Sequence, residues 1–159
     1  MPDDYLKIRW SCKNFTELTN EEVYKILQLR NAVFVVEQNC AYQDCDDKDQ
    51  HCFHVMGWQQ DALVAYCRLI PPGIAYKEPS IGRVVTASMV RGKNIGRELM
   101  ELSVKSIPEL FGVHSVTIGA QLYLKNFYES LGFIKTGDIY LEDGIEHIKM
   151  YLPDTNYIQ

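Results

Sequence analysis

The 159-residue chain has no hydrophobic run long enough to cross a membrane, because no segment reaches about 18 consecutive apolar residues. It is also short of positive charge, since 16 basic and 21 acidic side chains leave a net charge of −5. This balance argues against a nucleic acid or an anionic membrane as the main partner. The acidic start, Met1-Pro2-Asp3-Asp4, does not resemble an export signal. We expect a cytoplasmic protein that binds cationic or neutral small molecules.

Cysteine is too sparse for the dense, even framework of a small secreted fold. The five cysteines are Cys12, Cys40, Cys45, Cys52 and Cys67, and we expect reduced thiols. Three of them, Cys40, Cys45 and Cys52, lie near His51 and His54, and thiolate and imidazole are the preferred ligands of zinc. The spacing contains no C-x-x-C pair, so we expect no metal.

Hydrophobic patterning predicts one α/β domain over residues 1–159, with 47% hydrophobic residues to supply its core. A capping box of Thr19 and Glu22 opens a helix that runs towards Val36. Strands are predicted at 7–12, 52–58, 62–70, 80–86 and 114–119, further helices at 94–107 and 122–131, and a final hairpin around Asp143-Gly144. Pro108 and Gly132 should end the later helices. This order indicates a mixed, mostly antiparallel sheet with flanking helices.

An acidic segment at residues 44–49 reads Asp-Cys-Asp-Asp-Lys-Asp and has no apolar periodicity. Such a pattern predicts an exposed loop. Its field could attract a cationic ligand, or the charges could simply be solvated surface.

A phosphate site is indicated where the strand at 80–86 leads into the helix at 94–107. Backbone N–H groups and the helix dipole favour an anion at a helix amino terminus. The connecting segment is Arg91-Gly92-Lys93-Asn94-Ile95-Gly96, followed by Arg97. It fits neither the dinucleotide fingerprint G-x-G-x-x-G nor the nucleoside triphosphate loop G-x-x-x-x-G-K-[ST].

The segment is similar instead to the coenzyme A loop of GNAT acetyltransferases, which has arginine or glutamine, two residues, glycine, one residue, then glycine or alanine. Asn94 replaces the usual first glycine, but asparagine tolerates positive φ better than other side chains do. Downstream, Phe127-Tyr128-Glu129-Ser130-Leu131-Gly132-Phe133 resembles the Y-x-x-x-G-F ending of the same superfamily. Residues 29–42 and 81–84 resemble its ElaA-like group.

This resemblance implies a fold whose fourth strand splays from the fifth, with acetyl-CoA bound in the gap. Backbone groups of Val84, Val85 and Thr86 would then pair with pantetheine, while the loop from Arg91 to Gly96, with Arg97, would hold the pyrophosphate. Gln121 stands where many members have asparagine, seven positions before the tyrosine. The implied reaction is direct attack of a primary amine on acetyl-CoA in a ternary complex, without a metal.

The chemistry requires a base and an acid. An amine with a pKa of about 10.4 must lose a proton, and a thiolate whose thiol has a pKa of about 8.5 gains from a proton donor. The motif match makes Tyr128 the candidate acid, although a tyrosine at this spacing could simply be core. Glu37 and His54 are candidates for the base or for binding the acceptor. A solvated carboxylate and a structural histidine are the alternatives.

Two other functions stay open from the sequence. The chain could be a GNAT-fold module that binds acyl-CoA without turning it over, or an interaction domain with a vestigial loop. A cysteine nucleophile is not needed, because none of the cysteines lies in the GNAT motifs. A homodimer is compatible with the sequence, and the acceptor could be a small amine, a polyamine or a peptide amine.

Overall fold

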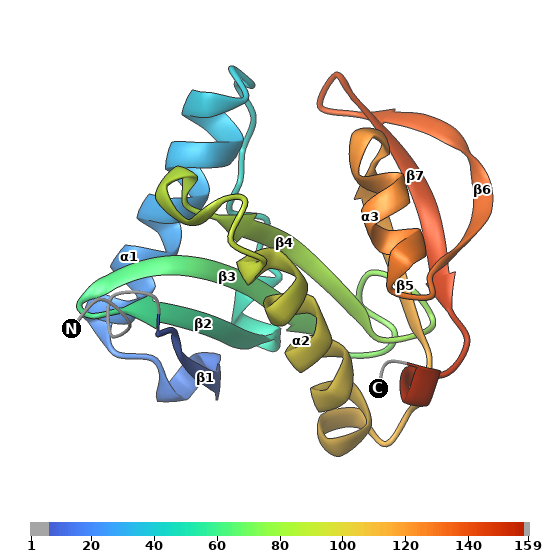
Figure 1. Ribbon diagram of the computed structural model, residues 1–159, viewed down its shortest axis with the longest axis horizontal. Helices are drawn as coiled ribbons and strands as arrows, with labels where there is room; N and C mark the ends of the chain where they lie inside the picture. Colours follow the sequence, from blue (N-terminus) through green and yellow to red (C-terminus); the bar gives the residue numbers. More distant parts are fainter. Residues whose placement is uncertain (1–6, 158–159) are drawn as a thin grey trace. The chain divides into compact units, whose positions relative to one another are not determined.

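The computed structural model describes residues 7–157 (Figure 1). Their elements follow the order strand, helix, three strands, helix, strand, helix, two strands, as the patterning predicted. The chain forms two compact units. The first contains the chain up to Arg68 and Arg83–Met100, and the second contains Leu69–Gly82 and the chain from Glu101 onwards. None of the described helices is both long and apolar enough to cross a membrane.

The first unit is built on a sheet with the order β1-β2-β3-β4. Its strands are β1 (Arg9–Asn14), β2 (Phe53–Gln59), β3 (Ala62–Ile70) and β4 (Ser80–Thr86). β1 and β2 are antiparallel, with Arg9 opposite Trp58. The core joins one helical face to the sheet and consists of Ile26, Leu29, Val33, Phe34, Met56, Trp58, Leu63, Tyr66 and Val85.

Helix α1 (Asn20–Arg30) begins where the capping box predicts. The Thr19 hydroxyl accepts a hydrogen bond from the Glu22 N–H at 3.1 Å, and the Glu22 carboxylate accepts one from the Thr19 N–H at 2.9 Å. The helix continues as a π-helix over Asn31–Glu37, and π-helical turns occur frequently at functional sites. Burial of Val33 and Phe34 anchors this extra segment to the core.

The second unit is built on a sheet with the order β5-β7-β6, and both pairings are antiparallel. Its strands are β5 (Val116–Gln121), β6 (Ile134–Glu142) and β7 (Ile145–Leu152). Asp143 and Gly144 have φ values of 51° and 76°, so the predicted hairpin turn is confirmed. Helix α3 (Lys125–Ser130) lies against this sheet (Figure 1).

Two helix boundaries differ from the prediction. Helix α2 spans Ile95–Phe111 and passes through Pro108, which was expected to stop it. Proline removes one backbone donor, but the helix continues to Phe111. Gly112 follows it with a φ of 67°, and its N–H donates to the Pro108 carbonyl at 2.9 Å. The stretch predicted as one helix over 122–131 starts with a 3₁₀ turn at Leu122–Leu124. Other 3₁₀ turns lie at Phe15–Glu17, Asp49–His51, Ser88–Val90 and Thr155–Tyr157.

Candidate active site

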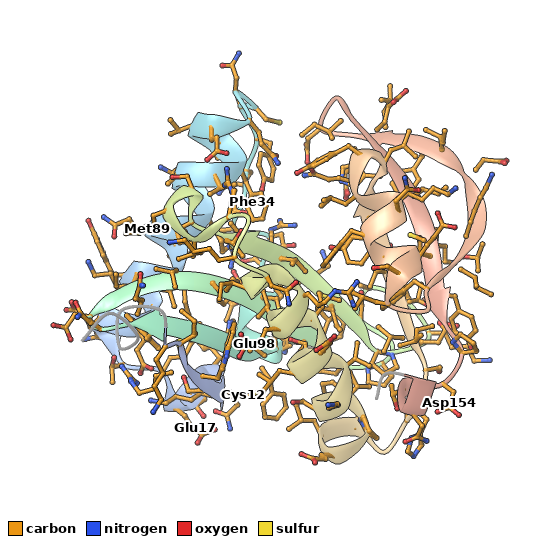
Figure 2. All side chains as sticks on the ribbon, viewed as in Figure 1. Cys12, Glu17, Phe34, Met89, Glu98 and Asp154 are labelled. Atoms are coloured by element: carbon orange, nitrogen blue, oxygen red, sulfur yellow. The ribbon has the colours of Figure 1, made fainter. Side chains whose placement is uncertain are left out.

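The predicted phosphate loop joins β4 to α2 within the first unit. Gly92 and Asn94 have φ values of 77° and 67°, so Asn94 adopts the left-handed conformation expected of a residue that replaces glycine. Helix α2 begins at the next residue, Ile95, and its first N–H groups lack intrahelical acceptors. Glu98, labelled in Figure 2, accepts a hydrogen bond from the indole of Trp10 at 3.0 Å and ties this first turn to β1.

The charged residues of the loop include a pairing that the sequence did not reveal. The guanidinium of Arg91 donates through both terminal nitrogens to the carboxylate of Glu37, with Nη2 3.1 Å from Oε2. Nη2 also donates to the carbonyl of Thr86 at 3.0 Å. The hydrogen bond from Arg91 lowers the pKa of Glu37, which makes that carboxylate a weaker base. Glu37 and Arg91, predicted for separate roles, therefore form one exposed unit at the end of β4.

Strand β4 carries the residues predicted to pair with pantetheine. It is the last strand in the order of its sheet, whereas β5 pairs with β7 in the other sheet. Val85 is buried in the core and Val84 is half-buried. Arg83, just before them, has a φ of 52°, which interrupts the extended backbone. An outer strand with an irregular backbone presents donors and acceptors that a neighbouring strand would otherwise occupy.

The acidic segment is not the plain exposed loop that the sequence predicted. Three of its carboxylates are paired with arginines from α1, β3 and β4 (the arginine–aspartate network: Asp44, Asp46, Asp49, Arg30, Arg68 and Arg83). Arg30 Nε lies 2.8 Å from Asp44, Arg68 Nη2 lies 2.6 Å from Asp46, and both arginines reach Asp49 at 2.8 Å. Arg30 and Arg68 are themselves buried. The loop charge is therefore neutralised locally, which weakens the alternative in which its field attracts a cationic ligand.

The network also supports the unusual backbone of β4. Arg83 donates through Nε to the Asp44 carboxylate at 2.8 Å and through Nη2 to the Asp44 carbonyl at 2.9 Å. These two hydrogen bonds fix the side chain of Arg83, whose own backbone has the left-handed conformation. The position of Val84 thus depends on a carboxylate that is distant in sequence.

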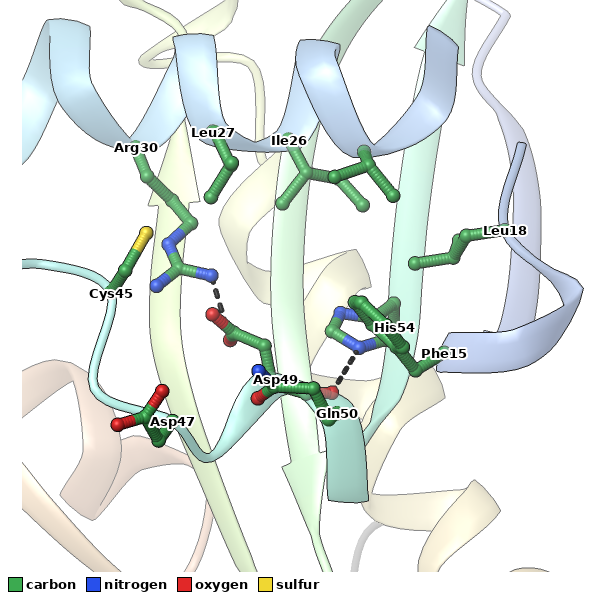
Figure 3. A pocket seen from close by; sticks show the side chains of 11 residues that line it. Phe15, Leu18, Ile26, Leu27, Arg30, Cys45, Asp47, Asp49, Gln50 and His54 are labelled. Atoms are coloured by element: carbon green, nitrogen blue, oxygen red, sulfur yellow. Dashed lines mark hydrogen bonds and ion pairs between the residues drawn. The ribbon is translucent and has the colours of Figure 1, made fainter. Parts of the chain in front are cut away.

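His54 is buried, with 1% of its surface exposed, and both ring nitrogens have partners in the protein. Nε2 lies 2.9 Å from the Asp49 carbonyl, which can only accept, so Nε2 carries the proton (Figure 3). Nδ1 then accepts a hydrogen bond from the Tyr66 hydroxyl at 2.7 Å. Burial lowers the pKa of His54. This geometry assigns His54 a structural position and argues against its predicted role as a base.

A pocket of about 150 Å³ lies beside His54 (Figure 3). Side chains of α1 and of the turn before it supply its apolar wall, and the acidic segment supplies its polar wall. It is lined by Phe15, Leu18, Val23, Ile26, Leu27, Arg30, Cys45, Asp47, Asp49, Gln50 and His54. Arg30 and Asp49 are bonded to each other across this polar wall.

Tyr128 and Gln121 belong to the second unit. Tyr128 is 4% exposed on α3, and its ring lies edge-on to Phe127 at 5.2 Å and to Phe133 at 5.8 Å. Gly132, with φ 98°, lets the Phe133 N–H return to the Tyr128 carbonyl at 3.1 Å. The Y-x-x-x-G-F motif is thus a helix-ending Schellman arrangement that fixes the tyrosine ring. Gln121 ends β5 opposite His147.

Most of the chain matches a known protein family. The acetyltransferase (GNAT) domain matches residues 15–153. The chain belongs to the GNAT acetyltransferase family. It is 42% identical to Protein ElaA of Escherichia coli K12 over 145 residues, which cover 90% of this chain and 95% of ElaA. The predicted resemblance to the ElaA-like group is confirmed.

Solved structures of the family agree with the GNAT fold. The crystal structure of Escherichia coli ElaA has a TM-score of 0.85 and 41% identity, covering 91% of this chain and 99% of that one. The structure of an acyl-CoA N-acyltransferase from Pseudomonas aeruginosa has a TM-score of 0.87 and 40% identity, with the same coverage of 91% and 99%. The co-substrate of GNAT enzymes is an acyl-CoA.

The cysteines show no arrangement for metal chemistry in the part of the chain that the structure describes. None of the five, all within the described residues, forms a disulfide, and no three His, Cys, Asp or Glu side chains within residues 7–157 are placed to hold a metal ion. Cys52 is buried and its thiol donates to the Lys48 carbonyl at 3.1 Å. Burial raises the pKa of Cys52 to about 11, which disfavours the thiolate that metal binding requires.

Replacing Asp49 by Asn should destabilise the protein strongly, by about 3–5 kcal/mol, because it leaves two buried guanidinium groups without their shared counter-charge. Asp47→Asn is the matched control: Asp47 lies in the same loop but is exposed, and asparagine tolerates its φ of 62°. Its effect should stay within about 0.5 kcal/mol. Urea unfolding of both variants at pH 7 measures the difference. Equal stabilities would show that the network does not hold the loop.

The same carboxylates predict an acid-sensitive fold. Burial alone would raise the pKa of Asp46 and of Asp49, but hydrogen bonds from Arg68 and from Arg30 respectively outweigh it, and both pKa values are lowered. An unfolded aspartate has a pKa of about 3.9. A lowered folded pKa contributes stability that is present above that value and is lost as pH falls. The free energy of unfolding should therefore decline between about pH 5 and pH 3, and less steeply in Asp46→Asn. Parallel slopes for the two proteins contradict this assignment.

Proposed function

We propose that the protein transfers an acetyl group from acetyl-CoA to a primary amine by direct attack in a ternary complex. The observation that carries the proposal is the loop before α2, where Gly92 and Asn94 take positive φ values and turn the backbone into the first turn of the helix. The N–H groups and the dipole at the start of a helix suit a pyrophosphate. Arg91, Lys93 and Arg97 add positive charge around it.

Binding of the cofactor would use two parts of the first unit. The outer edge of β4 at Val84, Val85 and Thr86 would pair with the amide groups of pantetheine, because both partners carry alternating donors and acceptors. The segment from Arg91 to Gly96, with Arg97, would take the pyrophosphate. Arg91 has five N–H donors in a planar fork, so it can maintain its hydrogen bonds to Glu37 while it donates to a phosphate oxygen. Glu37 would then position Arg91 rather than act as the base.

Tyr128 would protonate the departing thiolate. Its ring is fixed between Phe127 and Phe133, so the direction of its hydroxyl is set before any substrate binds. A fixed donor costs no reorganisation when charge develops on sulfur. Gln121 would keep the amide chemistry of the asparagine found in related enzymes.

One experiment tests the proposed function as a whole. Purified protein is incubated with acetyl-CoA and a panel of primary amines, including a small amine, a polyamine and a peptide amine, and thiol release is read. Transfer to at least one amine is the expected result. Acetyl-CoA binding without transfer to any of them would favour a non-catalytic acyl-CoA-binding module. Longer acyl-CoA donors in the same assay define the acyl preference.

Acetyl-CoA should raise the melting temperature of the protein. Gly96→Asp should weaken the affinity of the protein for acetyl-CoA by about tenfold or more, because a carboxylate at the helix start repels the pyrophosphate. Gly96→Ala is the matched control. An added Cβ there would meet only Thr86 Cγ2, at 3.9 Å, so alanine fits without displacement. Calorimetric titration compares the three proteins. Equal affinities for a folded Gly96→Asp protein and the parent would remove the phosphate site from this loop.

Tyr128→Phe removes one hydroxyl and keeps the aromatic body. If Tyr128 is the acid, kcat should fall by about 10²- to 10⁴-fold while melting temperature and acetyl-CoA affinity change little. Tyr123→Phe, on the preceding 3₁₀ turn and 72% exposed, is the control and should leave kcat unchanged. A loss of about 1 kcal/mol of stability with kcat preserved would make the hydroxyl a structural donor. Single-turnover rates are compared as well, because slow product release can hide a slower chemical step.

A further inference from the structure

One face of the β5-β7-β6 sheet carries polar and aromatic groups in place of core residues. Opposite residues of antiparallel strands point to the same side, so the pairs Gly119 with Lys149, Gln121 with His147, and Tyr140 with His147 define a common face. We call it the polar face (Gly119, Gln121, Tyr140, His147 and Lys149). The opposite side is the buried one, formed by Ile118, Ala120, Ile148 and Met150.

Two phenol groups converge over β5 at Gly119. A Cβ on Gly119 would lie 2.5 Å from the Tyr140 hydroxyl and 2.9 Å from that of Tyr76, so the space that a side chain would fill is occupied by these oxygens. The two hydroxyls are hydrogen-bonded to each other. Tyr76 comes from the segment between β3 and β4 and lies under the Lys149 ammonium, which is 5.3 Å from its ring centroid. Glycine at this position therefore permits a site made of side chains from three separate segments.

His147 is arranged differently from His54. Its Nδ1 lies 2.7 Å from the Ile145 carbonyl, which can only accept, so Nδ1 carries the proton of the neutral ring. Nε2 then bears the lone pair, and it faces the carboxylate of Glu142 at 3.5 Å. The ring of Tyr140 stacks on the imidazole at a centroid distance of 5.7 Å. A proton taken up at Nε2 would meet a carboxylate ready to stabilise the imidazolium.

Access and charge around His147 suit such a proton transfer. The His147 side chain is 10% exposed and that of Glu142 is 60% exposed, so a small part of the histidine reaches solvent beside an open carboxylate. Glu142 and Tyr140 from β6 contact the ring, and Gln121 from β5 is its other cross-strand neighbour. Lys149 lies two residues further along the same face of β7, and Tyr76, from the segment between β3 and β4, is hydrogen-bonded to Tyr140. Glu142 brings a negative charge to this face and Lys149 a positive one.

We propose that the polar face binds the acceptor amine and that His147 Nε2 is the base that deprotonates it, an inference that rests on the proposed function. The incoming ammonium would be held by the Glu142 carboxylate and the phenol oxygens. An N–H bond of the ammonium breaks and its proton moves to Nε2. The neutral nitrogen then attacks the thioester carbonyl carbon, the C–N bond forms and the C–S bond breaks. The second nitrogen proton is lost as the thiolate becomes a thiol, and His147 returns its proton to water.

His147→Asn tests the base directly. Asparagine retains a donor for the Ile145 carbonyl but has no lone pair at the position of Nε2. We expect kcat to fall by about 10²- to 10⁴-fold. The acidic limb of the pH–rate profile should disappear, and the melting-temperature rise caused by acetyl-CoA should remain. His114→Asn is the control, because His114 is an exposed histidine of the same unit beside Thr155 at 3.3 Å, and its rate and profile should match the parent.

Gly119→Ala provides an independent test of amine binding. Its new Cβ would displace the two phenol oxygens, so KM for the amine should rise about tenfold while the affinity for acetyl-CoA is unchanged.

If His147→Asn fails to fold, Glu142→Gln replaces it, with a lower kcat/KM and an altered acidic limb expected. A parent enzyme that transfers acetyl groups, with variants that keep its rate, profile and KM, overturns this inference alone. A parent that acetylates no amine overturns the proposed function with it.

Discussion

The first unit depends on one set of ion pairs, those between Arg30, Arg68 and Arg83 and the aspartates of the acidic segment. Two of the arginines are buried, and a buried charge is tolerated only when it is paired and hydrogen-bonded. The network therefore joins α1, β3 and β4 through a loop that has little apolar surface of its own. Its consequences reach the candidate site, because Arg83 bonded to Asp44 holds the irregular backbone beside Val84, and the Asp49 carbonyl selects the tautomer of His54.

Local patterns predicted most of the fold because they act between residues close in sequence. The Thr19–Glu22 capping box, the Asp143-Gly144 turn and the left-handed Asn94 each follow from the conformational preferences of a few neighbouring residues. The prediction that Pro108 ends its helix was wrong, because proline in the last turn removes one hydrogen bond without ending the helix. The helix ends just before Gly112, whose N–H donates to the Pro108 carbonyl. The prediction of an exposed acidic loop was wrong because the partners of its carboxylates are distant in sequence: Arg68 is 22 positions from Asp46, and Arg83 is 39 from Asp44. A charge run alone carries no information about distant counter-charges.

The sequence predicted which residues belong to the candidate site but not how they contact one another. The motifs identified the loop and Tyr128, but the bond between Arg91 and Glu37 spans 54 positions and joins two residues that had been assigned separately. The tyrosine motif also has a structural explanation that is independent of catalysis. Gly132 and Phe133 close the helix on the Tyr128 backbone and pack against its ring. The packing of the ring therefore says nothing about catalysis, and the proposed acid role concerns the hydroxyl alone.

The two histidines show why residue type and neighbourhood in sequence are insufficient to identify a base. His54 lies in an apolar strand near other polar residues, yet its Nε2 proton is committed to a carbonyl and its Nδ1 lone pair to a phenol. His147 lies in an alternating strand outside the sequence motifs, but its one bond to a carbonyl through Nδ1 leaves the lone pair on Nε2, beside a carboxylate. The difference is set by which nitrogen meets the backbone carbonyl and by what faces the other one. For His147, strand register brings Gln121 and Tyr140 beside the ring, and register is a property of the assembled sheet.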